Sequence, residues 1–234
     1  TVFSLSAGAT INTGDQSAFT TLLDYETASQ ITISDQNITV DSGTISVSNA
    51  NLLDATTTGT VTAEISSSSV DTLKTLTGTN AYTITIASGD ATGSTAAELT
   101  TISNATTVAI DASAVTGLAS DTAANIKTLL TAGNDTAQFT GASFESLATA
   151  VVSDTTLSGS DLAGAIDQAN TATGGTGTVF TISSASTITG SETNFTDLLS
   201  DENNNQINID SQNLTLSDPI SVDNANLLGA TTSG

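Results

Sequence analysis

Apolar residues recur along this chain in two alternating patterns. Short stripes at helical spacing begin with Phe19, Leu22 and Leu23, and further stripes follow about every 20 to 35 residues. Between them lie runs in which apolar and polar residues alternate, as in residues 82–86. Alternation of Thr with Ile or Val is typical of half-buried strands, whereas a stripe of two turns is too short to form a stable helix on its own.

The pattern predicts the following elements. Helical stripes are expected at Phe19/Leu22/Leu23, Val70/Leu73/Leu76, Leu99/Ile102, Ile126/Leu129/Leu130, Phe144/Leu147/Val151, Leu162/Ala165/Ile166 and Phe195/Leu198/Leu199. Strands are expected at 31–33, 38–40, 45–47, 82–86, 108–110, 179–182, 207–209 and 214–216. Thr95 and Glu98 form a capping-box pattern before one stripe, and Ile84 and Ile110 are expected to face the core.

Residues 1–59 and 178–234 are two copies of one sequence unit. TVFSLSAGATI (1–11) matches TVFTISSASTI (178–188), ITISDQN (31–37) matches INIDSQN (207–213), and ISVSNANLLDATTTG (45–59) matches ISVDNANLLGATTSG (220–234). Two single-residue gaps suffice to align them, so the offset drifts from 177 to 175. We therefore expect residues 1–177 to be one full long repeat and 178–234 to begin the next copy, as in a piece of a tandem array.

The short period inside the long one averages about 25 residues, which is the size of one coil of a stacked repeat protein. About seven such coils would fill residues 1–177. The chain is poor in aromatic residues, and small and β-branched side chains suit a narrow interior. We predict a mainly β fold, a β-solenoid of short strands with short helices along one edge. An array of β-sandwich domains is the alternative, although it predicts aromatic core anchors and proline-rich linkers.

Composition excludes several functional classes. The chain has 234 residues, with 24 acidic residues against two lysines and no His, Cys, Met or Trp, and its formal net charge is −22. Catalytic triads and thiol nucleophiles need His or Cys, and so do the usual zinc, haem and iron–sulfur sites. The negative charge would repel nucleic acid. No apolar run approaches the roughly 20 residues that span a bilayer, so we expect neither nucleic acid nor membrane insertion.

Calcium is the candidate cofactor. Oxygen ligands cluster in predicted loops, and Asp35, Asp41, Asp201, Asp210 and Asp218 are the carboxylates that could form weak calcium sites. The sequence contains neither the EF-hand loop pattern nor the calcium-binding nonapeptide. Diffuse screening of the acidic surface by counter-ions is the competing explanation.

The sequence does not predict an enzyme. Its aspartates mostly stand beside Ser, Asn or Gly, where turn and cap roles are more common than acid–base catalysis. An acidic β-helical enzyme acting on glycans is kept only as a remote alternative.

Several stretches resemble the repeats of a known class of protein. TTTGTVTAEI, LTGTNAYTITI, ATTVAIDASAVTGLASDTAANI and NANLLDATTTG are similar to the Thr/Ala/Asp-rich tandem repeats of giant cell-surface proteins from marine cyanobacteria and related bacteria. The same stretches also resemble the repeats of long phage fibres. The resemblance covers most of the chain, and it implies an extracellular stalk, filament or adhesive coat without defining functional residues.

We therefore expect a structural repeat segment of an extracellular fibre or surface protein, which provides reach, stiffness and self-association. Its partners would be other copies of itself, joined end to end or laterally, and it would lie at the cell surface or in a virion fibre. The alternative is an adhesin module that binds surface glycans through polar loops.

Overall fold

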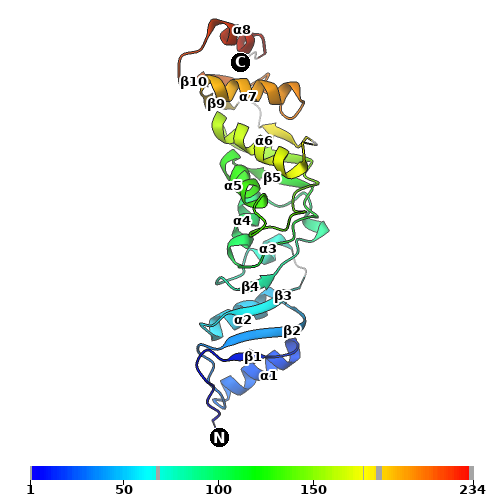
Figure 1. Ribbon diagram of the computed structural model, residues 1–234, viewed down its shortest axis with the longest axis vertical. Coiled ribbons are helices and arrows are strands. Elements are labelled where there is room, and N and C mark those ends of the chain that lie inside the picture. The colour runs from blue at the N-terminus through cyan, green and yellow to red at the C-terminus, as the bar shows by residue number, and fades with distance from the viewer. Residues whose placement is uncertain (1, 67–68, 176, 183–185, 232–234) are drawn as a thin grey trace. The chain divides into compact units, whose positions relative to one another are not determined.

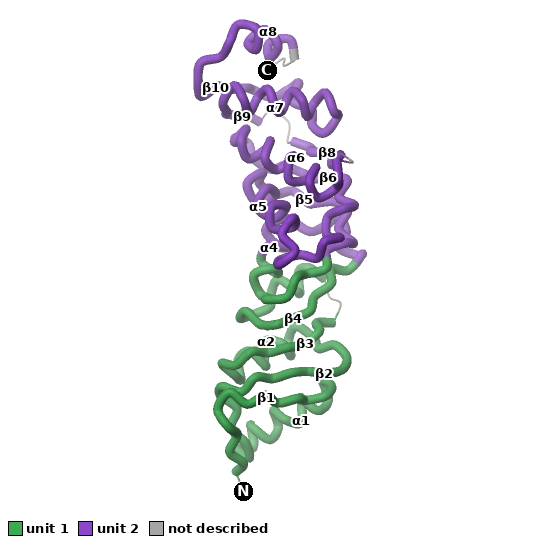
Figure 2. The backbone as a smooth tube through the Cα atoms, in the orientation of Figure 1, with its two compact units in different colours: residues 1–87, 101–111 green, residues 88–100, 112–234 purple. Residues whose placement is uncertain are grey.

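The computed structural model describes residues 2–66, 69–175, 177–182 and 186–231 (Figure 1). The chain divides into two compact units, residues 1–87 with 101–111 and residues 88–100 with 112–234 (Figure 2). The predicted sequence boundary at 177/178 falls inside the second unit. The division into units reflects packing within this chain, and the repeat boundaries stay a prediction.

Unit 1 contains one parallel sheet, in the order β1-β2-β3-β4. Its elements are β1 (Thr10–Asn12), α1 (Gln16–Thr27), β2 (Asn37–Ile45), α2 (Val47–Thr56), β3 (Val61–Ile65), α3 (Val70–Leu73) and β4 (Ala81–Thr83). Each strand pairs with the next one along the chain, with Ile11 opposite Ile38 and Ile38 opposite Val61. Parallel pairing follows from the connections, because a helix between two strands returns the chain to the same edge.

Unit 2 contains two three-stranded parallel sheets, in the orders β5-β6-β8 and β10-β9-β7. Its elements are the 3-10 helix η1 (Ser88–Asp90), β5 (Gly117–Asp121), α5 (Ala123–Gly133), β6 (Thr149–Val152), β7 (Thr156–Ser158), α6 (Gly159–Thr173), β8 (Val179–Ile182), β9 (Thr187–Gly190), α7 (Glu192–Asn203), β10 (Asn213–Leu216) and α8 (Val222–Thr231). The sequence of α4 (Ala96–Asn104) is divided between the two units.

The predicted mainly β solenoid is wrong, and so is the sandwich alternative. The fold is α/β, with 38% helix, 23% strand and, in the part of the chain described, three small parallel sheets and eight α-helices. Apart from the one at Phe144, the short stripes lie in helices, because packing and caps stabilise them. For example, the side chain of Asp15 accepts a hydrogen bond from the Ala18 amide at 2.9 Å at the start of α1. Phe19 of this stripe is buried, and Leu22 and Leu23 are half-buried.

Other sequence predictions have mixed outcomes. The capping box is confirmed, since the Thr95 amide donates to the Glu98 carboxylate at 3.0 Å and the Glu98 amide donates to Oγ1 of Thr95 at 3.2 Å. Ile84 and Ile110 are buried, as expected. The helical stripe predicted at Phe144 is wrong, because Phe144 adopts a φ of 63° and packs its ring 5.2 Å from that of Phe139.

The two copies of the sequence unit fold alike, each within its own unit. The elements β1, α1, β2 and α2 correspond to β9, α7, β10 and α8. The strand register is also shared, because Ile11 lies opposite Ile38 in the first copy and Ile188 lies opposite Leu214 in the second. Under the sequence alignment these are corresponding pairs.

Individual backbone hydrogen bonds repeat as well. The amide of Phe3 donates to the Gln30 carbonyl, and that of Phe180 donates to the Gln206 carbonyl, both at 2.7 Å. The residues preceding these glutamines, Ser29 and Asn205, are both left-handed, with φ of 54° and 58°. The unit therefore encodes its own turn geometry, and this geometry sets the site described next.

Candidate functional site

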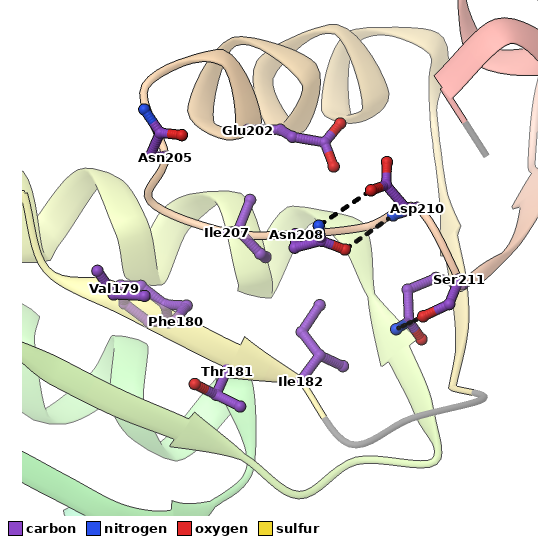
Figure 3. Close-up of a pocket in the computed structure, with 11 residues that line it drawn as sticks. Val179, Phe180, Thr181, Ile182, Glu202, Asn205, Ile207, Asn208, Asp210 and Ser211 are labelled. Atoms are coloured by element: carbon purple, nitrogen blue, oxygen red, sulfur yellow. Dashed lines mark hydrogen bonds between the residues drawn. The ribbon is translucent and has the colours of Figure 1, made fainter.

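A groove in unit 2 runs between β8 and the segment that follows α7 (Figure 3). Its cavity is about 480 Å³, with Val179 and Ile182 on the strand side and Glu202, Asn208 and Asp210 on the opposite side. Phe180 and Ile207 are almost fully buried beneath it. The groove thus combines an apolar floor with a rim of carboxylates and amides.

The turn after α7 shapes this groove. The helix begins at a capping box between Ser191 and Asn194, and Asn204 is its C-cap residue. Asn205, which has a left-handed backbone conformation, then reverses the chain, and the Gln206 amide donates a hydrogen bond to the Asp201 carbonyl at 2.9 Å. The chain is thereby brought alongside β8, where Phe180 donates its amide to Gln206.

The polar rim mainly holds the loop in shape. Asn208 donates its side-chain amide to Asp210 at 3.0 Å, and the Asp210 amide donates back to Oδ1 of Asn208 at 3.2 Å (Figure 3). The Glu202 carboxylate accepts the Ile209 amide at 2.9 Å. These hydrogen bonds give both carboxylates structural roles, and the rim offers amide and acid groups suited to hydroxyl-bearing ligands.

The same groove recurs in the first copy, inside unit 1. A hollow of about 300 Å³ lies between residues 2–5 and the segment after α1, and a second hollow of about 280 Å³ lies at the end of α1 and the turn that follows it. Their lining includes Glu26, Ser29, Ile31 and Asp35. The positions lining the two grooves correspond under the repeat. The recurrence makes the groove a property of the repeated unit.

A cluster of acidic side chains lies where α6 packs on α7. Burial raises the pKa of Asp201, the nearby carboxylates of Asp167 and Asp197 add to this rise, and together they bring the pKa to about 6. Asp201 is one of the predicted calcium residues. Its raised pKa means that the folded state disfavours its charge.

The other predicted calcium residues are dispersed. Asp35 accepts the side-chain amide of Gln36 at 2.7 Å, and Asp41 is exposed on β2. Asp218 accepts the Glu192 amide at 3.0 Å and so caps α7, while Asp210 belongs to the groove rim. Across the described residues, no three acidic side chains form a group that could hold a metal ion. Calcium binding stays a prediction.

Sequence reasoning missed Glu202, Asn205 and Asn208 and the pairing of Asn170 with Gln206. These two side chains exchange amide hydrogen bonds between α6 and the turn after α7. The internal repeat is the sequence signal that could have indicated these residues, because it aligns Ser29 and Gln30 of the first copy with Asn205 and Gln206 of the second.

The two lysines sit beside aspartates. Lys74 pairs with Asp71 on its own short helix, and Lys127 contacts Asp161 at 3.0 Å. Because these pairs are partly exposed, each contributes little to stability. The surface field is therefore set by the excess of carboxylates.

In the described part of the chain, no helix combines the length and hydrophobicity needed to cross a membrane. Comparison with known proteins gives no match among family profiles, curated proteins or solved structures.

Proposed function

We propose that this chain is a structural repeat segment of an extracellular fibre or giant surface protein, and that its role is reach, stiffness and association with further copies of itself. The supporting observation is that the two copies of one sequence unit build corresponding elements, β1, α1, β2 and α2 in the first and β9, α7, β10 and α8 in the second, with a shared strand register. A unit that folds alike in two settings is suited to tandem repetition. The resemblance to Thr/Ala/Asp-rich surface repeats supports the same role.

The charge of the chain fits an exposed fibre. A net charge of −22 keeps neighbouring molecules apart at low salt, and screening by salt would allow them to bundle. The proposal places the protein at the cell surface or in a virion fibre and assigns it no catalytic step.

The parent gene provides the test. Many tandem copies of the unit of about 176 residues would support a stalk. A single copy beside a distinct terminal domain would overturn it in favour of a module.

The second candidate is a glycan-binding adhesin module, and the observation that favours it is the recurrent groove. Amide and carboxylate groups above an apolar floor suit polyhydroxylated ligands. A screen against surface polysaccharides tests this function, with Asn208→Ala as the variant and Asn125→Ala, on the exposed side of α5, as the control. Binding lost only in Asn208→Ala would support the adhesin, and equal behaviour of both variants would refute groove binding.

A further inference from the structure

The first-copy face, defined as residues 2–5, Tyr25 and Gln30, includes two exposed positions, Phe3 and Gln30, whose counterparts are buried in the second copy. Phe3 is 65% exposed, whereas its counterpart Phe180 is 2% exposed. Gln30 is exposed, whereas its counterpart Gln206 is 5% exposed. The turn and its backbone hydrogen bond to Phe3 or Phe180 are shared by the two copies, but residues 179–182 form β8 against β6 whereas residues 2–5 form no strand. The difference in exposure therefore follows from what packs on each face.

The second copy shows what kind of element covers this face. Strand β6 pairs in parallel with β8, with Ala150 opposite Phe180, and the Val179 amide donates to the Ala148 carbonyl at 2.9 Å. Beside it, Asn170 of α6 exchanges hydrogen bonds with Gln206. One strand–helix layer, residues 149–173, therefore supplies the strand partner, the apolar cover and the amide partner.

We propose that the first-copy face docks against the β6–α6 layer of another copy of this repeat. The proposal rests on the proposed function and deepens it by naming the joining surface. The strand of the docked layer would pair with residues 2–5, and the layer would bury Phe3. The residue of the docked layer that corresponds to Asn170 would form hydrogen bonds with Gln30.

Charge also favours this occupant. In the second copy, α6 presents Asp167 to a helix that carries Asp197 and Asp201. The corresponding positions on α1 are Thr21 and Tyr25 under the repeat alignment. The same α6 layer would thus meet two fewer carboxylates on the first-copy face, which matters in a chain as acidic as this one.

The proposal can be tested by extending the full chain. A second copy of residues 112–177 is placed before residue 1, so that the new junction, Gly177 followed by Thr-Val-Phe, reproduces the sequence at 177–180. The control carries residues 46–111 at the same place, which has the same length but does not continue the repeat. Amide hydrogen exchange is then measured in both proteins. Acrylamide quenching of Tyr25 fluorescence is measured in versions in which every Tyr82 is replaced by Phe, so that Tyr25 is the tyrosine observed.

Docking predicts that exchange at the Val2 amide slows at least tenfold in the extended chain and not in the control, and that Tyr25 becomes less accessible to quencher. Exchange at residues 179–182 reports whether the original layers remain folded. Equal exchange at residues 2–5 in the two proteins would overturn the proposal, as would an extended chain that does not fold cooperatively, because a matching layer should add stability. If added glycan, and not the added layer, slows exchange at residues 2–5, the face binds a ligand, and this result would also overturn the proposal.

A second pair of variants uses the natural chain length as its reference. Phe180→Asp should lower the melting temperature of the 234-residue chain, and Phe3→Asp should have a smaller effect because Phe3 is exposed there. In the extended chain Phe3→Asp should become as damaging as Phe180→Asp. If its effect stays small, the face is not covered by the added layer. This test is independent of the parent gene, so failure of the joining surface and failure of the fibre proposal can be told apart.

Discussion

Replacing Asp201 with Asn should stabilise the protein at neutral pH. Asp201 lies on α7, and burial together with Asp167 and Asp197 raises its pKa to about 6 from the ordinary value of 3.8. Asn keeps the size of the side chain and removes the charge that the folded state disfavours. The unfolded chain loses little, because its aspartate is solvated.

The magnitude follows from the pKa. One pH unit corresponds to about 1.4 kcal/mol, so the full difference sets a ceiling of about 3 kcal/mol. Asp201 is only partly buried, and solvent screening reduces the expected gain to about 1–2 kcal/mol. For a protein of this size that gain raises the melting temperature by roughly 2 to 8 °C.

The pH dependence gives the prediction its sign. Because the folded pKa is raised, the stability linked to Asp201 is fully present below about pH 4 and is lost as the pH rises toward 6. The advantage of Asp201→Asn should therefore be full at pH 7 and much smaller at pH 4.5. Asp24→Asn, an exposed change on α1, controls for the lower net charge.

Thermal unfolding followed by circular dichroism at the two pH values measures the difference between each variant and the parent chain. A gain at pH 7 no larger than that of Asp24→Asn would refute the reasoning. So would a gain of the same size at both pH values, because a protonated Asp201 carries no charge for Asn to remove.

Three further predictions test the core, the layer contacts and the calcium hypothesis. Ile84→Asp should lower the melting temperature sharply, since it puts an unpaired charge at a position that is 2% exposed. Thr83→Asp, at the exposed neighbouring position, should not. Wild-type stability of Ile84→Asp would refute the placement of Ile84 in the core. Gly59→Ala should destabilise the protein by about 1–3 kcal/mol, because the added Cβ would clash with the Gln36 carbonyl oxygen. The control is Gly93→Ala, whose Cβ meets open space and which should be near neutral. Equal urea-unfolding midpoints for the two variants would contradict the close approach at Gly59. EDTA at low salt should lower the stability or alter the bundling of the native protein if calcium is bound, and a melting curve and light scattering unchanged by chelation would remove calcium from the account.

The sequence pattern located many elements and still gave the wrong fold class. The stripes at Phe19, Ile126 and Leu162 correspond to α1, α5 and α6, although each is too short to be stable as an isolated helix. Packing and side-chain caps supply most of a helix's stability in a folded protein, and neither is visible in periodicity. Hydrophobic periodicity alone therefore underestimates the helical content.

Particular residues show where local reading fails. Residues 45–47 alternate as a strand would, yet Ile45 ends β2 and Val47 begins α2, because the side chain of Ser46 caps the helix. The alternating Ile207 and Ile209 lie in an irregular segment whose path is set by Asn205 and by the Glu202 contact with the Ile209 amide. These tertiary and turn contacts have no signature in hydrophobic spacing.

The candidate groove could be foreseen only in part. The internal repeat indicates that residues 2–31 and 179–207 share a conformation, but hydrophobic patterning does not reveal that Phe3 is exposed while Phe180 is covered. That contrast depends on which layer packs on each copy. It appears only when the two copies are compared in three dimensions.

Immunogold electron microscopy of the native source most directly tests the central claim, that this chain is a repeated segment of an extracellular fibre. An antibody raised against residues 1–59, which should also recognise the matching second copy, is applied to intact cells or virions. The account predicts gold at regular intervals along filaments outside the cell or along virion fibres. Label confined to the cell interior, or to isolated compact particles, would contradict it.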